Sequence, residues 1–169
     1  MTDSRTVADR AGRMFTLLFI GCAAIIAYAL YLQHVKDLDP CPWCIVQRLG
    51  YIAIGLLALI AALWRPAGFG IGVFSLLAAL LAIGGGAAAT YHIYLQRDPE
   101  RANACTGSAL EKMLDASHIG KMIPPLLQYD GPCTLKPWSM LGLSVPEWSL
   151  VGFILVLIWV IVLPFASRR

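Results

Sequence analysis

The strongest constraint on the fold is a run of nineteen residues, Met14 to Leu32, that contains no charged side chain. Such a run is long enough to cross the roughly 30 Å hydrocarbon core of a bilayer as an α-helix. Three further apolar stretches follow it, and only 14% of the 169 residues are charged, against about one quarter in a soluble domain. We therefore expect an integral membrane protein.

The four apolar stretches predict an all-α membrane protein with four transmembrane helices in a single integral membrane domain, residues 1–169. The expected spans are residues 14–32, 45–64, 67–95 and 148–166. Two loops, residues 33–44 and 96–147, join spans on one side. In the second loop, Ser108 to Glu111 matches a capping box, and the stripe of apolar residues after it favours a short helix on the membrane surface; packing within the loop is the alternative.

The first span has two other interpretations, both involving cleavage. Ala27 to Ala29 has the small-x-small pattern of a signal-peptide cleavage site, and Phe19 to Cys22 faintly resembles a lipoprotein-processing box. The apolar segment before Cys22 is short and the segment after it stays apolar, so we expect an uncleaved helix. Cys22 is then a buried apolar residue within the membrane, far from the other thiols.

Positive charges near the ends of the spans indicate the orientation. With four spans, the basic residues at both chain ends and after the second span share one side: Arg5, Arg10, Arg13, Arg65, Arg168 and Arg169. This distribution predicts cytoplasmic N- and C-termini. Cys41, Cys44, Cys105 and Cys133 then lie on the opposite face, where disulfides persist. The net charge of +3 is too small and scattered to indicate nucleic-acid binding.

The sequence CPWC, residues 41–44, stands where the second span begins. Two cysteines at this spacing can form a disulfide and reopen it, whereas so small a closed loop restrains little chain entropy and makes a static bridge the weaker interpretation. Pro42 suits the first helical position, which places Cys44 in the first turn, where the helix dipole favours a thiolate. Cys105 and Cys133 form a second pair, for which a structural disulfide stabilising the loop by about 3 to 4 kcal/mol is a strong alternative.

Two polar residues complete the candidate site. Arg48 lies one turn after Cys44 on the same helix face and inside a span, so its charge would stabilise a thiolate; the alternative is that it extends to lipid headgroups. His92 ends the third span at the same membrane face and could donate a hydrogen bond to a ligand oxygen, although it could equally be an interfacial histidine. A thiolate beside a cation at the bilayer edge fits a quinone, ubiquinone or menaquinone, because a quinone dissolves in the bilayer and accepts two electrons.

Several motifs together resemble those of the DsbB family, bacterial inner-membrane proteins that generate disulfides. They are Gln33-His34, Cys41 to Ile45, Gln47-Arg48, Tyr91-His92, Cys105, Cys133, Trp138, Leu141 to Leu143 and Pro146 to Trp148. The resemblance implies a four-helix bundle in the bacterial inner membrane that re-oxidises a DsbA-like thiol oxidase of the periplasm and passes two electrons to a membrane quinone.

The resemblance also implies a role for each site residue. Cys105 would form the intermolecular bond with the partner, Cys133 would then exchange with Cys41, and the freed Cys44 would face a quinone bound near Arg48 and His92. The protein would therefore be an enzyme, a protein-dithiol:quinone oxidoreductase.

Three alternatives remain open. A vitamin K epoxide reductase-like protein would have its redox dithiol after the loop pair, the reverse of the order here. A membrane scaffold with two static disulfides is the non-enzymatic alternative. Metal binding by the four outer thiols is disfavoured because no conventional ligand spacing links the two pairs, so we expect no metal.

Overall fold

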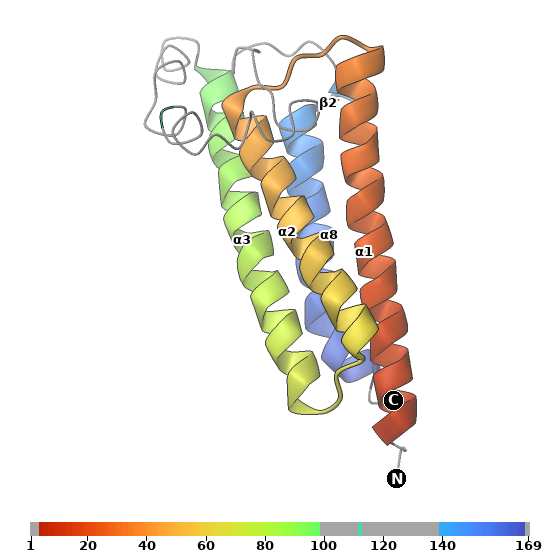
Figure 1. The fold of residues 1–169 in the computed structure, drawn as a ribbon. Coiled ribbons are helices and arrows are strands. Elements are labelled where there is room, and N and C mark those ends of the chain that lie inside the picture. Colours follow the sequence, from red (N-terminus) through yellow and green to blue (C-terminus); the bar gives the residue numbers. More distant parts are fainter. Residues whose placement is uncertain (1–3, 99–111, 113–138, 168–169) are drawn as a thin grey trace.

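The computed structural model describes residues 4–98, 112 and 139–167, and these form an upright bundle of four long helices (Figure 1). The helices are α1 (Ser4–Val35), α2 (Pro42–Trp64), α3 (Phe69–Arg97) and α8 (Val145–Ala166). All four are long and apolar enough to cross a membrane. The predicted fold class, an all-α membrane protein with four spanning helices, is therefore confirmed.

Helix α2 begins and ends at residues whose backbone preferences explain its bounds. Cys41 is the N-cap in an extended conformation and Pro42 follows at the start of the helix, where a missing N–H leaves no hydrogen bond unmade. Arg65 ends the helix in the left-handed conformation, with φ of 47°, and Pro66 cannot continue it. The same Arg65 donates a hydrogen bond of 2.8 Å to Asp9, which ties this turn to the beginning of α1.

A small hairpin that the sequence interpretation did not include precedes α8. Strand β1 (Ser139–Met140) pairs antiparallel with β2 (Leu143–Ser144). The two residues between them, Leu141 and Gly142, both have positive φ, 55° and 81°, which is the backbone of a two-residue type I′ turn.

The start of α8 follows directly from this hairpin. The Glu147 carboxylate accepts hydrogen bonds from the Ser144 backbone N–H, at 2.7 Å, and from its hydroxyl, at 2.8 Å, within a capping box. The helix consequently begins at Val145, ahead of the predicted span.

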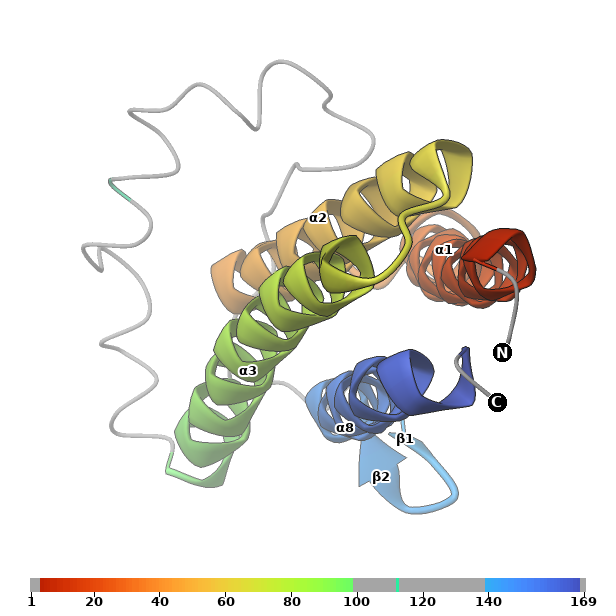
Figure 2. The same ribbon diagram turned by 90° about the horizontal axis from the view of Figure 1, so that it is seen from below.

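Close packing of the bundle depends on small residues in α3. Each helix packs against the next one in the chain: α1 against α2, α2 against α3, and α3 against α8. Helices α1 and α8 contact each other only sparsely (Figure 2). A Cβ placed on Gly85 would overlap the ring of Phe153 in α8, and this ring stacks on Tyr51 of α2 with centroids 4.2 Å apart. Small residues at such a crossing let membrane helices approach closely. Cys22 is buried in the same core, as predicted.

Part of the long second loop lies outside the described residues. Cys105, Cys133, the predicted capping box at Ser108 to Glu111 and the expected surface helix all fall there. The described site therefore consists of the helices, the segment before α2 and the hairpin before α8.

Candidate functional site: a dithiol beside an apolar cavity

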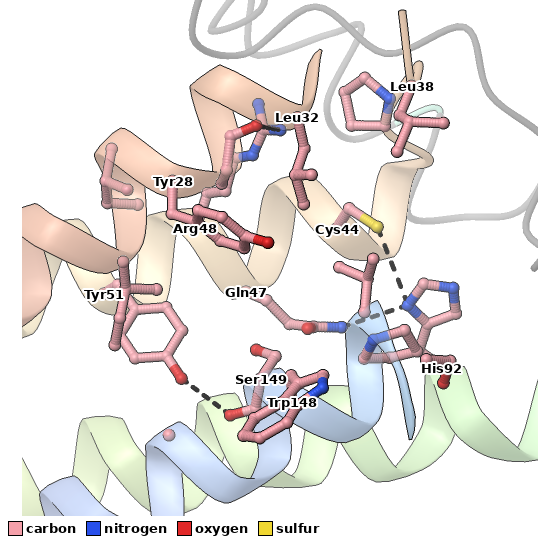
Figure 3. Close-up of a pocket in the computed structure, with 18 of the residues that line it drawn as sticks. Tyr28, Leu32, Leu38, Cys44, Gln47, Arg48, Tyr51, His92, Trp148 and Ser149 are labelled. Carbon is pink, nitrogen blue, oxygen red and sulfur yellow. Dashed lines mark hydrogen bonds between the residues drawn. The ribbon is translucent and has the colours of Figure 1, made fainter. Parts of the chain in front are cut away.

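A cavity of about 670 Å³ lies at the end of the bundle where α2 begins (Figure 3). Its walls come from α1, α2, the end of α3, the start of α8 and the segment at residues 37–41. Four residues singled out from the sequence, Cys41, Cys44, Arg48 and His92, line it. The bundle thus brings together residues from two helices that are 44 to 51 positions apart in sequence.

The two thiols of α2 are held side by side by the first turn of the helix. The backbone N–H groups of Cys44 and Ile45 both donate to the Cys41 carbonyl, at 2.9 and 3.2 Å. The Cys41 S–H in turn donates to the Cys44 sulfur, at 3.4 Å. Cys41 is buried, whereas Cys44 is partly exposed toward the cavity. The two sulfurs are therefore close enough to form a disulfide with little movement, and Cys44 is the more exposed of the two.

His92 contacts both sulfurs from α3 and is itself held by Gln47. The Gln47 amide nitrogen donates to His92 Nδ1 at 3.2 Å, so Nδ1 is an acceptor and the proton of a neutral ring is on Nε2. This Nε2 lies 3.4 Å from the Cys41 sulfur, and Nδ1 lies 4.0 Å from the Cys44 sulfur. Both His92 and Gln47 are buried, with 2% and 4% of their surfaces exposed.

These hydrogen bonds form one chain of donors that ends at Cys44. Gln47 donates to His92, His92 donates to Cys41, and Cys41 donates to Cys44. Donors aimed at a sulfur, together with the N-terminal end of the helix dipole, favour negative charge on it. The hydrogen bond to Cys44 and burial both raise the pKa of Cys41, so this thiol keeps its proton.

Arg48 lies deeper in the cavity wall and connects α2 to α1. Only 7% of its surface is exposed, so it does not extend to the lipid headgroups as the alternative interpretation required. Its guanidinium donates to Gln33 Oε1 at 2.6 Å and to the Ala29 carbonyl at 3.3 Å. The positive charge thus stands at a defined place in a mostly apolar wall, and Arg48 lines the same cavity as Cys44.

The rest of the cavity wall is mostly apolar, and the Ser149 hydroxyl is a hydrogen-bonding group within it. Tyr51 donates its hydroxyl to the Ser149 carbonyl at 2.7 Å (Figure 3). The Ser149 hydroxyl itself is buried and has no hydrogen-bond partner among the described residues. Lining residues of α1 and α8 include Tyr28 and Leu155, and 45% and 61% of their surfaces are exposed. The cavity therefore opens sideways between these two sparsely packed helices.

Three polar residues of this site had no role in the sequence-based interpretation. In the sequence, Gln33 and Gln47 stand out only as motif neighbours of His34 and Arg48, and Ser149 belongs to no motif. The sequence does contain one signal for the two glutamines. An amide side chain within or beside an uncharged apolar run needs a polar partner inside the protein. Which partner it finds depends on how the helices pack, so only the structure connects Gln33 to Arg48 and Gln47 to His92.

Fold and site together define a class: a multi-pass membrane protein with a reactive dithiol at one end of its helix bundle. The family comparison agrees with this class. A sequence model of the family described as "Disulfide bond formation protein DsbB" matches residues 11–163.

Similar proteins of three bacteria have the same family name. Disulfide bond formation protein B of Stutzerimonas stutzeri is 42% identical over 150 residues, covering 86% of this chain and 91% of that protein. The Hahella chejuensis protein is 39% identical, covering 83% and 86%, and disulfide bond formation protein B 1 of Pseudomonas aeruginosa is 41% identical, covering 84% and 87%. The chain belongs to the DsbB family, and it is a disulfide-forming membrane oxidoreductase.

Proposed function

We propose that the protein re-oxidises a DsbA-like thiol oxidase of the periplasm and delivers the two electrons to a membrane quinone. The observation that carries this proposal is the position of the Cys44 sulfur, which lies 3.4 Å from Cys41 and faces an apolar cavity that also holds a buried arginine. A dithiol at the mouth of such a cavity can exchange electrons with a molecule that is dissolved in the bilayer.

The relay proposed here uses two cysteine pairs. A thiolate of the partner attacks Cys105 of the Cys105–Cys133 disulfide, and its second thiol then displaces Cys105, which leaves the partner oxidised and this pair reduced. Cys133 next attacks Cys41 of the Cys41–Cys44 disulfide, and Cys44 leaves as a thiolate. Cys105 then displaces Cys41 from the mixed disulfide, so the loop pair is oxidised again and Cys41 and Cys44 are the reduced pair.

The residues around the cavity fit a quinone as the acceptor. When bound, a quinone supplies a two-electron, two-proton sink with two carbonyl oxygens. The Ser149 hydroxyl has a hydrogen to donate and no described partner for it, and Arg48 has a fixed positive charge in the same wall. The volume of about 670 Å³ is within the range of about 300 to 1,000 Å³ usual for ligand sites. Arg48 and Ser149 would hold the oxygens, while Cys44 donates electrons.

The arrangement of the helix ends supports the proposed orientation. Helix α1 begins and α8 ends at the same end of the bundle as the α2–α3 turn, and α2 begins at the opposite end (Figure 1). Cys41, the N-cap of α2, therefore lies at that opposite end. Arg5, Arg10, Arg13 and Arg65 belong to the first of these ends. An excess of Lys and Arg marks the cytoplasmic side of a membrane protein, so we place the termini in the cytoplasm, the dithiol at the periplasmic face, and the whole chain in the bacterial inner membrane as one domain.

The test is quinone-dependent oxidation of a reduced DsbA-like protein by the purified full-length chain in detergent. We expect turnover with ubiquinone or menaquinone, two thiols of the partner being oxidised for each quinone reduced. Cys105→Ala should stop oxidation of the partner while the Cys41–Cys44 dithiol is still oxidised by added quinone.

The matched control for this test is Cys22→Ala, because Cys22 is buried in the core and contacts no other described thiol. This variant should turn over normally. Partner oxidation at the normal rate by Cys105→Ala, or by protein stripped of quinone under nitrogen, would refute the relay.

A further inference from the structure

We propose that the reduced dithiol and His92 form a binding site for a thiophilic divalent cation of the Zn²⁺ class, which occupies the site in place of the Cys41–Cys44 disulfide. The ligand atoms are the sulfurs of Cys41 and Cys44 and one ring nitrogen of His92, and they all lie within 4.8 Å of one another. This site does not depend on the identity of the electron acceptor.

The separations between the ligand atoms match what zinc requires. Zinc binds sulfur at about 2.3 Å and imidazole nitrogen at about 2.0 to 2.1 Å in a tetrahedron, so two sulfur ligands stand about 3.8 Å apart and a sulfur and a nitrogen about 3.5 Å apart. The two sulfurs here are 3.4 Å apart, and Cys41 Sγ is 3.4 Å from His92 Nε2. The third separation, between Cys44 and the ring, is longer: Cys44 Sγ lies 4.0 Å from His92 Nδ1, and the three ligand atoms all lie within 4.8 Å of one another. Movement of the Cys44 side chain and the imidazole toward each other would therefore complete three of the four ligand positions.

Gln47 supplies the outer hydrogen bond that a metal-binding histidine needs. Coordination through Nε2 places the ring proton on Nδ1, which must then donate to an acceptor. The Gln47 amide stands 3.2 Å from Nδ1, and half a turn of the amide presents its oxygen there instead of its nitrogen. The same side chain can thus stabilise either ring tautomer, one for the free dithiol and the other for the metal-bound form.

Charge balance favours a divalent ion. Two thiolates and a neutral imidazole have a total charge of −2, so a divalent cation gives a neutral cluster, which is less costly to keep away from water than a charged one. Each thiol that still has its proton releases it to solvent on binding. The cavity beside Cys44 provides room for a water as the fourth ligand, the arrangement found where the protein supplies only three.

Metal binding and the disulfide exclude each other, because both need the same pair of sulfurs. Zn²⁺ would therefore hold Cys41 and Cys44 reduced and stop electron transfer until a chelator removes it. The site makes the enzyme sensitive to free zinc only in the reduced half of its cycle.

The experiment measures cadmium binding to the full-length protein in detergent, without oxygen, by the ultraviolet thiolate-to-cadmium charge-transfer absorption, with Zn²⁺ as competitor. Cys105→Ser and Cys133→Ser are present in every sample, so that loop thiols do not contribute. We expect one Cd²⁺ per reduced chain and none when Cys41 and Cys44 are oxidised. His92→Ala should weaken binding at least tenfold, and Gln47→Leu should weaken it roughly 10- to 100-fold.

The matched controls are His34→Ala, which removes an exposed histidine of α1, and Cys22→Ser, which removes the remaining thiol; both should bind Cd²⁺ as before. Equal binding by oxidised and reduced protein, or unchanged affinity in His92→Ala, would overturn the proposal. If His92→Ala fails to fold, X-ray absorption of the zinc-loaded protein with His92 intact decides. Two sulfurs and one imidazole around zinc support the site, and any other ligand set refutes it.

Discussion

Replacing Gly85 by alanine tests the packing that positions the site. Its Cβ would overlap the Phe153 ring, which is 1% exposed and stacks on Tyr51 of the cavity wall. The neighbouring Gly84 is a matched control, since a Cβ there meets no described atom within 4 Å. Both substitutions occur in the same turn of α3 and add the same methyl group.

The expected difference follows from two terms. Glycine to alanine in a helix interior contributes about 0.8 to 1.0 kcal/mol through helix propensity, and both variants gain it. Forcing a methyl group into a packed core costs about 1 to 3 kcal/mol, and only Gly85→Ala meets that cost. We therefore expect Gly85→Ala to have a free energy of unfolding about 1 to 3 kcal/mol below that of Gly84→Ala.

The assay is denaturation by sodium dodecyl sulfate of the full-length protein in mixed micelles, followed by circular dichroism. A third sample combines Gly85→Ala with Phe153→Leu, which shortens the side chain that the methyl group strikes. The two changes should be coupled by about 0.5 to 3 kcal/mol in the stabilising direction. Equal stabilities for the Gly84 and Gly85 variants would show that α3 and α8 do not cross as described.

Three predictions concern the site itself. Arg48→Lys keeps the charge but replaces the two guanidinium nitrogens that reach Gln33 and Ala29 with a single ammonium nitrogen. Loss of one hydrogen bond from a charged group, about 1.5 to 3 kcal/mol, should raise the quinone KM tenfold or more, while Arg10→Lys leaves it unchanged. Ser149→Ala should raise the same KM about two- to twelvefold, as expected for a hydrogen bond of about 0.5 to 1.5 kcal/mol. Ser75→Ala removes a buried hydroxyl outside the cavity wall that likewise has no hydrogen-bond partner among the described residues, and it should not change this KM. The hydrogen bond to Cys44 and burial raise the Cys41 pKa, so alkylation of reduced Cys41, measured by mass spectrometry, should be slow near pH 8 and still increase above about pH 9. Cys44→Ala should move this increase to lower pH, and an unchanged pH profile would contradict the role assigned to the hydrogen bond.

Much of the architecture could be predicted from the sequence because its signals are local. A long uncharged run has few alternatives to a spanning helix, and proline after Cys41 predicts a helix start there. The partners of His92 could not be predicted, because they depend on the rotation of α3 against α2.

The hairpin and the start of α8 differ from the sequence-based prediction for two separate reasons. Leucine is unusual at the positive φ that Leu141 adopts, so the turn lacked the Asn-Gly signal of its type. The pattern from Ser144 to Glu147 is a recognisable capping box, but the apolar run starting at Trp148 dominated the interpretation of this segment. The capping box therefore contains enough local information to predict where α8 begins, whereas the residues of the hairpin turn do not contain enough to predict the hairpin.

The sideways opening of the cavity between α1 and α8 has a consequence for how affinity must be expressed. A hydrophobic molecule that arrives by this route is drawn from a two-dimensional solution, so its mole fraction among the lipids, and not its amount per litre, sets the occupancy. Adding detergent at a fixed quantity of such a molecule dilutes it within the apolar phase and should raise the apparent Michaelis constant in proportion to micelle volume. Values obtained in nanodiscs and in micelles should coincide only after they are converted to mole fractions.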